Sequence, residues 1–227
     1  MGKYTYDERN PRPFPLFSPA HRHLLLLLGW VAYLLSYCLT EAWIDPKNCT
    51  PIHCFVDDWI PFCEWFLIPY VLWYGLIAFS LLYFLLHNVE SFRRLQWYFI
   101  VLQFCATVIY ILFPNRQDLR PSAMPRENPL TYAVAYLYRL DTNTNVCPSL
   151  HVGCSVAIAS VWLKTPGVSR GAKGAIVALS ALICLSTVFL KQHSVLDGFA
   201  AMVLCMGAEW LLFSGYYRRK VCQSAPY

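Results

Sequence analysis

The sequence predicts an all-α membrane protein whose main body is a bundle of six transmembrane helices. Of its 227 residues, 57% are hydrophobic and 14% are charged, whereas a soluble domain carries roughly 25% charged residues. The mean hydropathy of +0.41 agrees with this deficit of charge. The net charge of +5 comes with no basic stripe and no nucleic-acid-binding motif. We therefore expect the bilayer, and no nucleic acid, as the partner of the chain.

Six stretches without charged residues mark the expected helices. A helix needs about 20 mainly apolar residues to cross the hydrocarbon core of a bilayer. Five stretches have this length, the last of them with Glu209 included, and the fourth reaches it when it is counted from Cys147 to Lys164. The stretches are 24–40, 65–86, 95–115, 152–163, 174–190 and 198–217.

The basic residues predict how these helices are oriented. Twelve of the 18 Lys and Arg residues fall in the terminal segments and the even-numbered connections. Cytoplasmic loops carry an excess of Lys and Arg, so both termini are expected in the cytoplasm, with the plasma membrane as the location. The chain then divides into a cytoplasmic segment (1–22), a membrane domain (23–217) and a basic cytoplasmic tail (218–227).

One long connection, residues 114–148, separates the third and fourth helices. Asn128 and Pro129 suit an N-cap and a first helical position. The segment that follows, LTYAVAYLYRL, repeats apolar residues at nearly helical spacing. We expect a short helix here that lies on the outer membrane surface.

The first outer loop holds a candidate metal or headgroup site. His53 and Asp57 are four residues apart and Asp58 adjoins them. A metal or headgroup site is one interpretation, and an ordinary solvated acidic loop is the other. Cys49 and Cys54 share the loop and could form a disulfide in an oxidising compartment.

The segment KQHSVLDG, residues 191–198, places ionisable side chains at the start of the last apolar stretch. In a helix, His193 and Asp197 would lie one turn apart on one face. A carboxylate there accepts the imidazole N–H and leaves the other ring nitrogen as a nucleophile. The alternative is a helix-end histidine bound to a capping aspartate, but ionisable residues at a membrane boundary are functional by default.

A second histidine follows an expected helix start in CPSLHVG, residues 147–153. Pro148 and Ser149 suit the start, and His151 lies on the first turn. The backbone N–H groups at such a start bind anions. In the structural alternative, Ser149 only caps the helix and His151 reaches toward the interface.

The chain length between the two histidines brings them to the same side. The 41 residues between His151 and His193 allow one helix inward, a turn and one helix outward. Arg116, Arg120 and Arg126, in the loop before the fourth helix, lie on that side as well. Two imidazoles, a carboxylate, helix N-termini and several cations on one face suit the transfer of a phosphoryl group.

Three motifs in this half of the chain carry a family resemblance. They are RP at 120–121, PSLH at 148–151 and SxxxxxxHxxxD at 186–197. Their order and separation resemble the motifs of the type 2 phosphatidic acid phosphatases. This superfamily spans membrane lipid phosphatases, soluble vanadium haloperoxidases and sphingolipid phosphotransferases. The resemblance covers residues 114–205, and six helices match the membrane branch.

The resemblance implies a role for each residue. His193 would attack phosphorus and form a phosphohistidine, Asp197 would orient His193, and His151 would protonate the departing alkoxide. Arg120 would bind phosphate oxygens. The resemblance implies neither a metal nor another cofactor. The substrate would be an amphiphilic phosphate monoester, diester or pyrophosphate presented from the membrane.

Three positions depart from the pattern of the family. The lysine that opens its first motif is replaced by Phe113, and Arg116 would substitute if the helix extends that far. The arginine after the serine of the third motif is Thr187 here, and Lys191 would supply the charge if the helix reaches it. Leu150 stands where the phosphatases have glycine, so the backbone N–H is kept and bulk is added beside the phosphate.

PSLH and the KQHSVLD segment also resemble fungal inositol phosphorylceramide synthases and their bacterial relatives. Those enzymes pass a phosphoryl headgroup to a lipid alcohol, and a drier pocket favours such an acceptor because catalysis depends on which nucleophile is positioned. We expect a lipid phosphatase or phosphotransferase that acts at the outer or lumenal face. The alternative of a different class is a non-catalytic anion-binding or transport protein.

Overall fold

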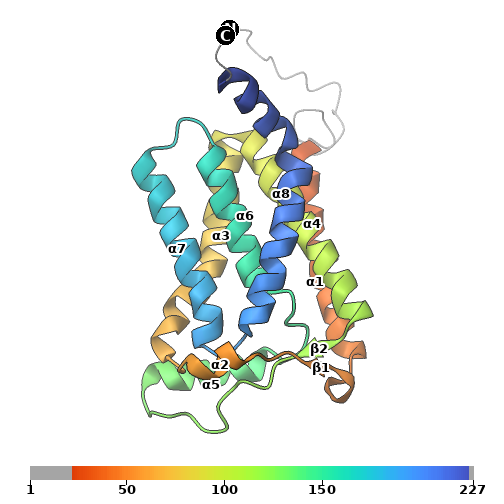
Figure 1. The fold of residues 1–227 in the computed structure, drawn as a ribbon, viewed down its shortest axis with the longest axis vertical. Coiled ribbons are helices and arrows are strands. Elements are labelled where there is room, and N and C mark those ends of the chain that lie inside the picture. Colours follow the sequence, from red (N-terminus) through yellow and green to blue (C-terminus); the bar gives the residue numbers. More distant parts are fainter. Residues whose placement is uncertain (1–21, 225–227) are drawn as a thin grey trace, which may run out of the picture.

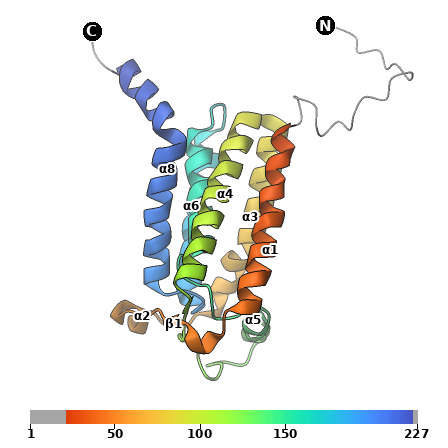
Figure 2. The ribbon, with the colours of Figure 1, turned by 90° about the vertical axis from the view of Figure 1, so that its right-hand side faces the viewer.

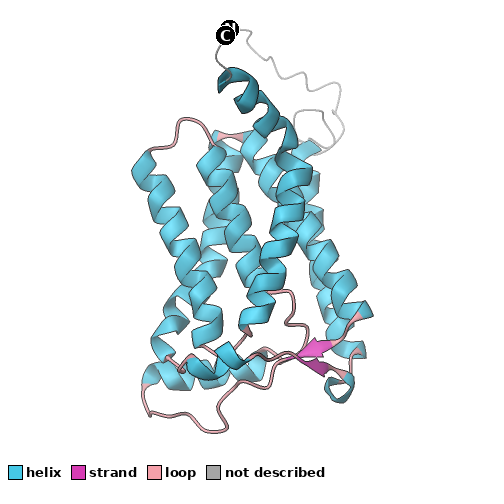
Figure 3. Cartoon of the chain, in the orientation of Figure 1, coloured by secondary structure: helices cyan, strands magenta, loops and turns pink. Residues whose placement is uncertain are grey.

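The computed structural model describes residues 22–224, with side chains placed from residue 22 to 217, and shows a helical bundle with short elements across one end (Figures 1 and 3). The helices are α1 (Leu28–Trp43), α2 (Phe55–Trp59), α3 (Leu67–His87), α4 (Val89–Leu112), α5 (Pro129–Leu140), α6 (Leu150–Lys164), α7 (Arg170–Phe189) and α8 (Val195–Ser224). Three 3-10 turns cover Arg22–Leu27, Pro46–Asn48 and Glu64–Phe66. Two short parallel strands, β1 (Thr50–Pro51) and β2 (Asn115–Arg116), pair with each other.

Five helical segments are long and apolar enough to cross a membrane. This confirms the predicted all-α class and indicates an integral membrane protein. Large apolar side chains on these segments are exposed, as lipid-facing residues are in a bilayer. The five segments are Arg22–Trp43, Glu64–His87, Val89–Leu112, Arg170–Phe189 and Val195–Tyr217.

The central helix of the bundle is α6, which is apolar but only 15 residues long. It packs against α3, α4, α7 and α8, and nine of its residues are buried. At about 1.5 Å per residue it spans roughly 22 Å, less than the core of a bilayer, about 30 Å thick. Figure 1 shows that its lower end stops short of the lower ends of α7 and α8.

The short elements gather at the lower end of the bundle (Figure 1). The predicted helix in the long connection is confirmed as α5, capped by Asn128, whose side chain accepts a hydrogen bond from the Thr131 N–H. Val134 is fully buried, while Tyr132 and Tyr136 on its other face are exposed. This amphipathic helix crosses the ends of the membrane-length helices, as Figure 2 also shows.

Two helix limits differ from the sequence-based prediction. The third stretch was expected to begin at residue 95, but α4 begins at Val89, because Arg94 pairs with Glu90 one turn away and so fits a helical position. The basic tail was expected to follow the last helix, but α8 continues through Ser224. The expected N-terminal segment lies outside the described residues, apart from Arg22, and so does the end of the tail.

The described ends of the chain lie at the same end of the bundle. Figure 2 shows the start of α1 and the end of α8 at the top, and α2 and α5 at the bottom. The connection between α6 and α7 is also at the top (Figure 1). His151, on the first turn of α6, and His193, just before α8, therefore lie at the end opposite to both described ends.

Candidate active site

His193 and Asp197 meet as the sequence predicted, although they do not share a helix. The Nδ1 of His193 lies 3.1 Å from Oδ2 of Asp197, but α8 begins only at Val195. Asp197 is fully buried and also accepts a hydrogen bond from the Ser194 N–H. A carboxylate only accepts hydrogen bonds, so Nδ1 carries the proton and Nε2 keeps a free lone pair. His193 is thus held in the tautomer that suits a nucleophile.

The start of α8 is held by Asp57, which sequence reasoning placed in a solvated acidic loop or a metal site. The solvated-loop interpretation is wrong for Asp57, which is 2% exposed, and no three ligand side chains of the described residues gather around it to hold a metal ion. Its carboxylate accepts hydrogen bonds from Ser194 Oγ at 2.6 Å and from the Val195 N–H at 2.8 Å. His53 pairs instead with Asp58. Asp57 thereby fixes the backbone that carries His193.

His151 lies on the first turn of α6, as predicted, after the N-cap Ser149. Its ring stacks on Tyr70 and Trp73 of α3, with ring centres 4.3 and 4.1 Å away. The centre of the His193 ring is 6.0 Å from that of His151. The Nε2 of His151 has no hydrogen-bond partner in the described part of the chain. The two imidazoles therefore lie within reach of one small group.

The two motifs are also joined through their backbones. The Ser149 N–H donates to the carbonyl of Asp197 at 3.1 Å, and the hydroxyl of Tyr110 donates to the carbonyl of Pro148 at 2.7 Å. Asn115 is fully buried and binds the Val146 N–H through Oδ1. These contacts fix the start of α6 against the start of α8.

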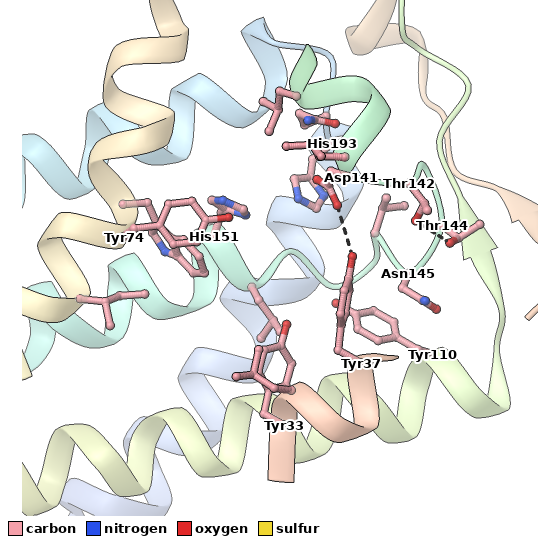
Figure 4. A pocket seen from close by; sticks show the side chains of 18 of the residues that line it. Tyr33, Tyr37, Tyr74, Tyr110, Asp141, Thr142, Thr144, Asn145, His151 and His193 are labelled. Atoms are coloured by element: carbon pink, nitrogen blue, oxygen red, sulfur yellow. Dashed lines mark hydrogen bonds between the residues drawn. The ribbon is translucent and has the colours of Figure 1, made fainter. Parts of the chain in front are cut away.

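A cavity of about 540 Å³ opens beside the histidines. Figure 4 shows His151 and Tyr74 on one side of it, Tyr33, Tyr37 and Tyr110 on another, and Asp141 next to His193. The cavity is lined mainly by aromatic and aliphatic side chains of α1 and α3, together with the end of α5 and the start of α6. Such a mainly apolar lining with few polar groups is typical of a small-molecule site.

Asp141 is the acidic side chain that lines this cavity. It follows α5 directly and accepts a hydrogen bond from the Tyr37 hydroxyl at 3.3 Å. Burial raises the pKa of Asp141 above its ordinary value, and Arg120 and His193 oppose that shift. A carboxylate on the wall of this cavity can accept hydrogen bonds from hydroxyl groups of a bound molecule.

The predicted phosphate-binding cations do not line the cavity. Arg116 lies in β2 and not on an extended helix, because α4 ends at Leu112; it pairs with Asp118 and donates to the Pro46 carbonyl. Lys191 lies beyond the end of α7, with φ of 53°, and donates to the carbonyl of Asp57. The helical placement on which the expected roles of Arg116 and Lys191 depended is therefore wrong.

Arg120 and Arg126 also have partners in the structure. Arg126 forms two hydrogen bonds with Glu64, at 2.9 and 2.7 Å. The guanidinium of Arg120 lies over the ring of Tyr138, 4.6 Å from its centre. Its Nη1 and Nη2 donate to backbone carbonyls and to Gln192 Oε1, while its Nε is buried and has no hydrogen-bond partner among the described residues. Of the predicted phosphate-binding residues, Leu150 lines the cavity.

The polar residues of the cavity that sequence reasoning missed include Tyr37, Asp141 and Gln192. Gln192 adjoins His193 in KQHSVLDG, so its position was a usable signal. Tyr37 and Asp141 are brought to the site by α1 and α5, and their sequence neighbours give no comparable signal. The interfacial helix thus contributes a site residue as well as a surface.

No three His, Cys, Asp or Glu side chains of the described residues are arranged to hold a metal ion. The cysteines of residues 22–217 are free, so Cys49 and Cys54 form no disulfide in this structure. Instead, Cys49 is buried and its thiol donates to the carbonyl of Asp45. Comparisons with protein-family models, with curated proteins and with solved structures gave no match for this chain.

Proposed function

We propose that the protein is a membrane lipid phosphatase or phosphotransferase of the type 2 phosphatidic acid phosphatase superfamily, working through a phosphohistidine. The observation that carries this proposal is the pair of imidazoles at one cavity. The hydrogen bond to Asp197 leaves Nε2 of His193 free to attack. The centres of the His193 and His151 rings are 6.0 Å apart. Both rings line the same cavity, so one bound phosphoryl group can contact both of them.

The chemistry balances in two steps. In the first, Nε2 of His193 forms a bond to phosphorus, the bond from phosphorus to the leaving oxygen breaks, and His151 gives that oxygen a proton. In the second, water or an alcohol gives a proton to His151 and attacks phosphorus, and the P–N bond breaks. Splitting the displacement in this way replaces one difficult step by two easier ones.

The cavity gives a specific reason to keep the transferase alternative. Leu150 lines the cavity beside His151, and its other walls carry tryptophan, tyrosine and leucine side chains. Such a lining limits the space for water and accommodates an apolar acceptor, which favours transfer to a lipid alcohol, as in inositol phosphorylceramide synthase-like enzymes. The steps up to the phosphohistidine are common to both reactions.

The proposal includes a topology. We add α6 to the five membrane-length segments as one further span, which gives six, because the loops at its two ends extend its path through the bundle. The distribution of Lys and Arg supports cytoplasmic termini and histidines on the outer or lumenal side. The expected location is the plasma membrane. A lipid phosphate would reach the cavity from the outer leaflet.

The first test uses protein purified in detergent and offered phosphatidic acid or an aryl phosphate without magnesium. We expect turnover that orthovanadate inhibits, because vanadate adopts the five-coordinate geometry of phosphorus in the transition state. His193→Ala is expected to lower kcat by at least about 1,000-fold, since it removes the nucleophile. A labelled phosphoenzyme should form with the wild type and not with this variant.

Two outcomes would redirect the proposal. Added ceramide or diacylglycerol that converts the product from free phosphate to a new phospholipid would identify a transferase. A protein that binds vanadate but neither turns over phosphate esters nor forms a phosphoenzyme would be a non-catalytic anion-binding or transport protein. Ser122→Ala, in an exposed part of the loop between β2 and α5, serves as the control for handling and folding.

A further inference from the structure

The cation expected to hold phosphate is separated from the cavity by another side chain. Arg120 donates through Nη1 to the carbonyls of Tyr138 and Asp141, at 3.1 and 2.9 Å. Through Nη2 it donates to the Thr142 carbonyl at 2.9 Å and to Oε1 of Gln192 at 2.6 Å. Arg120 does not line the cavity, whereas Gln192 does.

The side-chain amide of Gln192 is hydrogen-bonded through its oxygen, while its NH₂ group has no partner among the described residues. Its side chain is buried, with 2% of the residue exposed. A guanidinium has only donors, so the atom that faces Arg120 must be the oxygen, and the NH₂ group must be the opposite end. That Nε2 has no hydrogen-bond partner within residues 22–224. An unpaired buried donor is unfavourable, and a hydrogen-bond acceptor on a ligand in the cavity would remove that cost.

The neighbours of Gln192 identify the ligand that its NH₂ group suits. His193 is the next residue and His151 lines the same cavity. The backbone around Gln192 is fixed, because the N–H groups of Gln192 and His193 both donate to the Thr187 carbonyl, at 3.0 and 3.1 Å. A fixed donor beside a nucleophile, with a cation behind it, favours an oxyanion.

We propose that the Gln192 side-chain amide donates a hydrogen bond to a non-bridging oxygen of the phosphoryl group, and that Arg120 acts through Gln192 as a positioning residue. The inference rests on the proposed function and names a contact to the tetrahedral oxyanion. The guanidinium polarises the amide through Oε1, which strengthens the N–H donor at the other end. Arg120 therefore acts on the phosphoryl oxygen through the polarised amide of Gln192 and does not contact the phosphate itself.

The decisive variant is Gln192→Glu, tested by the binding of orthovanadate to the purified protein. A glutamate keeps an oxygen for Arg120 but replaces the NH₂ donor with a second oxygen that repels the anion. We expect roughly 100-fold weaker vanadate binding, in the range found for loss of one oxyanion donor, at a thermal stability near that of the wild type. Gln192→Met, which removes both amide ends, should weaken vanadate binding as well and also lower stability.

A purely structural role for Gln192 predicts the opposite result. If Gln192 only anchored Arg120, Gln192→Glu would strengthen that contact and leave vanadate affinity unchanged, and this outcome would overturn the inference. Should Gln192→Glu not fold, unchanged vanadate affinity in Gln192→Met overturns it equally. The matched control is Gln117→Met, because Gln117 is also a fully buried glutamine with an unpartnered Nε2 but does not line the cavity. Its vanadate affinity should stay unchanged.

A double-mutant cycle tests the relay. Arg120→Met combined with Gln192→Met should weaken vanadate binding little more than Gln192→Met does alone, because the cation acts through the amide. Additive losses would show that Arg120 contacts the anion itself and would overturn the relay. A wild-type protein that neither binds vanadate nor forms a phosphoenzyme fails the proposed function instead. If the wild type binds vanadate and forms a phosphoenzyme, but Gln192→Glu binds vanadate equally well, only this inference is wrong.

Discussion

Asn115 shows how a single side chain fixes the path of the chain into His151. Its Oδ1 accepts from the N–H groups of Val146 and Cys147, at 2.9 and 2.8 Å. Its Nδ2 donates to the carbonyls of Phe113 and Cys147, both at 2.9 Å. Of the side chains of this size, only an amide offers both two donors and an acceptor, so neither aspartate nor leucine could replace it. These bonds fix the loop before α6, whose regular pairing is limited to an isolated bridge between Thr144 and Arg116.

Asp57 has the corresponding role at the start of α8. It bonds to Ser194 and Val195 and also accepts the Cys54 N–H at 2.8 Å, so it ties the first outer loop to the helix. A carboxylate at a helix N-terminus also interacts favourably with the helix dipole. Asp57→Ala should destabilise the protein by roughly 1–3 kcal/mol, the cost of leaving buried donors unpaired. Thermal unfolding in detergent measures this, and kcat should fall with it because His193 loses its support.

The effect of Asp57 should depend on pH. Burial tends to raise the pKa of Asp57, but its hydrogen bonds from Ser194, Val195 and Cys54 together outweigh burial and lower the pKa below 3.8. A carboxyl with a lowered folded-state pKa contributes stability above its unfolded pKa and loses it as the pH falls through the folded value. The difference between wild type and Asp57→Ala should therefore be full at pH 6 and shrink below about pH 3.8.

The neighbouring residue provides the control for Asp57. Asp58 pairs with His53, and their side chains are 64% and 47% exposed. Exposed ion pairs contribute little, so Asp58→Ala should change the unfolding temperature by no more than about 1–2 °C. Equal destabilisation by the two variants would show that the loop is sensitive as a whole and that Asp57 is not its anchor.

At the residue scale, the sequence located the candidate site residues better than the residues that support them. The spacing of His151, His193 and Asp197 predicted that they meet at one end of the bundle, as they do. Asp57 could not be placed, because its partners lie 137 and 138 residues away. Two acidic residues in a polar loop look alike in sequence, and only the fold shows that one is buried and the other is exposed.

Among the elements, α5 is fixed across the end of the bundle by Glu64. This carboxylate precedes α3 and is 3% exposed, while the side chain of its partner Arg126 is 57% exposed. Asn128, which caps α5, also donates to Glu64 at 2.9 Å. The anchor matters to the site because Asp141 and the carbonyls that hold Arg120 lie at the other end of α5.

Removing this anchor should loosen α5 without unfolding the bundle. Glu64→Ala leaves Arg126 free to turn to water, so we expect a modest loss, roughly 1–2 kcal/mol, for the docking of α5. Backbone hydrogen exchange should become faster in α5 and stay unchanged in α6. Glu90→Ala, which breaks the exposed Glu90–Arg94 pair in α4, is the control and should leave exchange in α5 unaltered. Unchanged exchange in Glu64→Ala would mean that apolar packing alone holds α5.

The element limits show which sequence signals are reliable. Uncharged stretches located the membrane-length helices, because charge is costly in hydrocarbon wherever the helix goes. They failed at the ends, where charged residues such as Arg94 remain helical while their side chains leave the apolar zone. The expected helical placement of Lys191 and Arg116 failed for a related reason: α7 and α4 end before these residues, so a helical face cannot be extended from the sequence spacing.

For the whole molecule, the short α6 determines how deep the site lies. The neighbouring α3 and α7 have 21 and 20 residues, against 15 in α6. Figure 1 shows that α6 begins deeper in the bundle than the neighbouring helix ends at the same side. His151, on its first turn, therefore lies inside the bundle, among aromatic residues of α3. A recessed site excludes water and strengthens its electrostatic interactions. Under the proposed function, this architecture favours a substrate with an apolar tail over a free soluble phosphate.

The same architecture predicts which loops are accessible from each side of the membrane. The loop that contains Ser122 lies at the histidine end, and the connection that contains Pro166 lies at the opposite end. Single cysteines, Ser122→Cys and Pro166→Cys, would be placed in a background without other reactive thiols. An impermeant maleimide should label Ser122→Cys in intact cells and Pro166→Cys only after permeabilisation. Leu82→Cys, 56% exposed on the side of α3, should resist labelling in both cases, because lipid covers it.

Each alternative result of the labelling has a distinct meaning, because the two loops are separated by one passage of the chain along α6. Labelling of both cysteines in intact cells would show that α6 does not cross the membrane and would leave five spans. The reverse pattern would keep the fold and turn the histidines toward the cytoplasm, against the distribution of Lys and Arg. The phosphoryl donor would then have to come from the inner leaflet. The side on which Ser122→Cys reacts therefore selects the leaflet whose lipids should be offered as substrates.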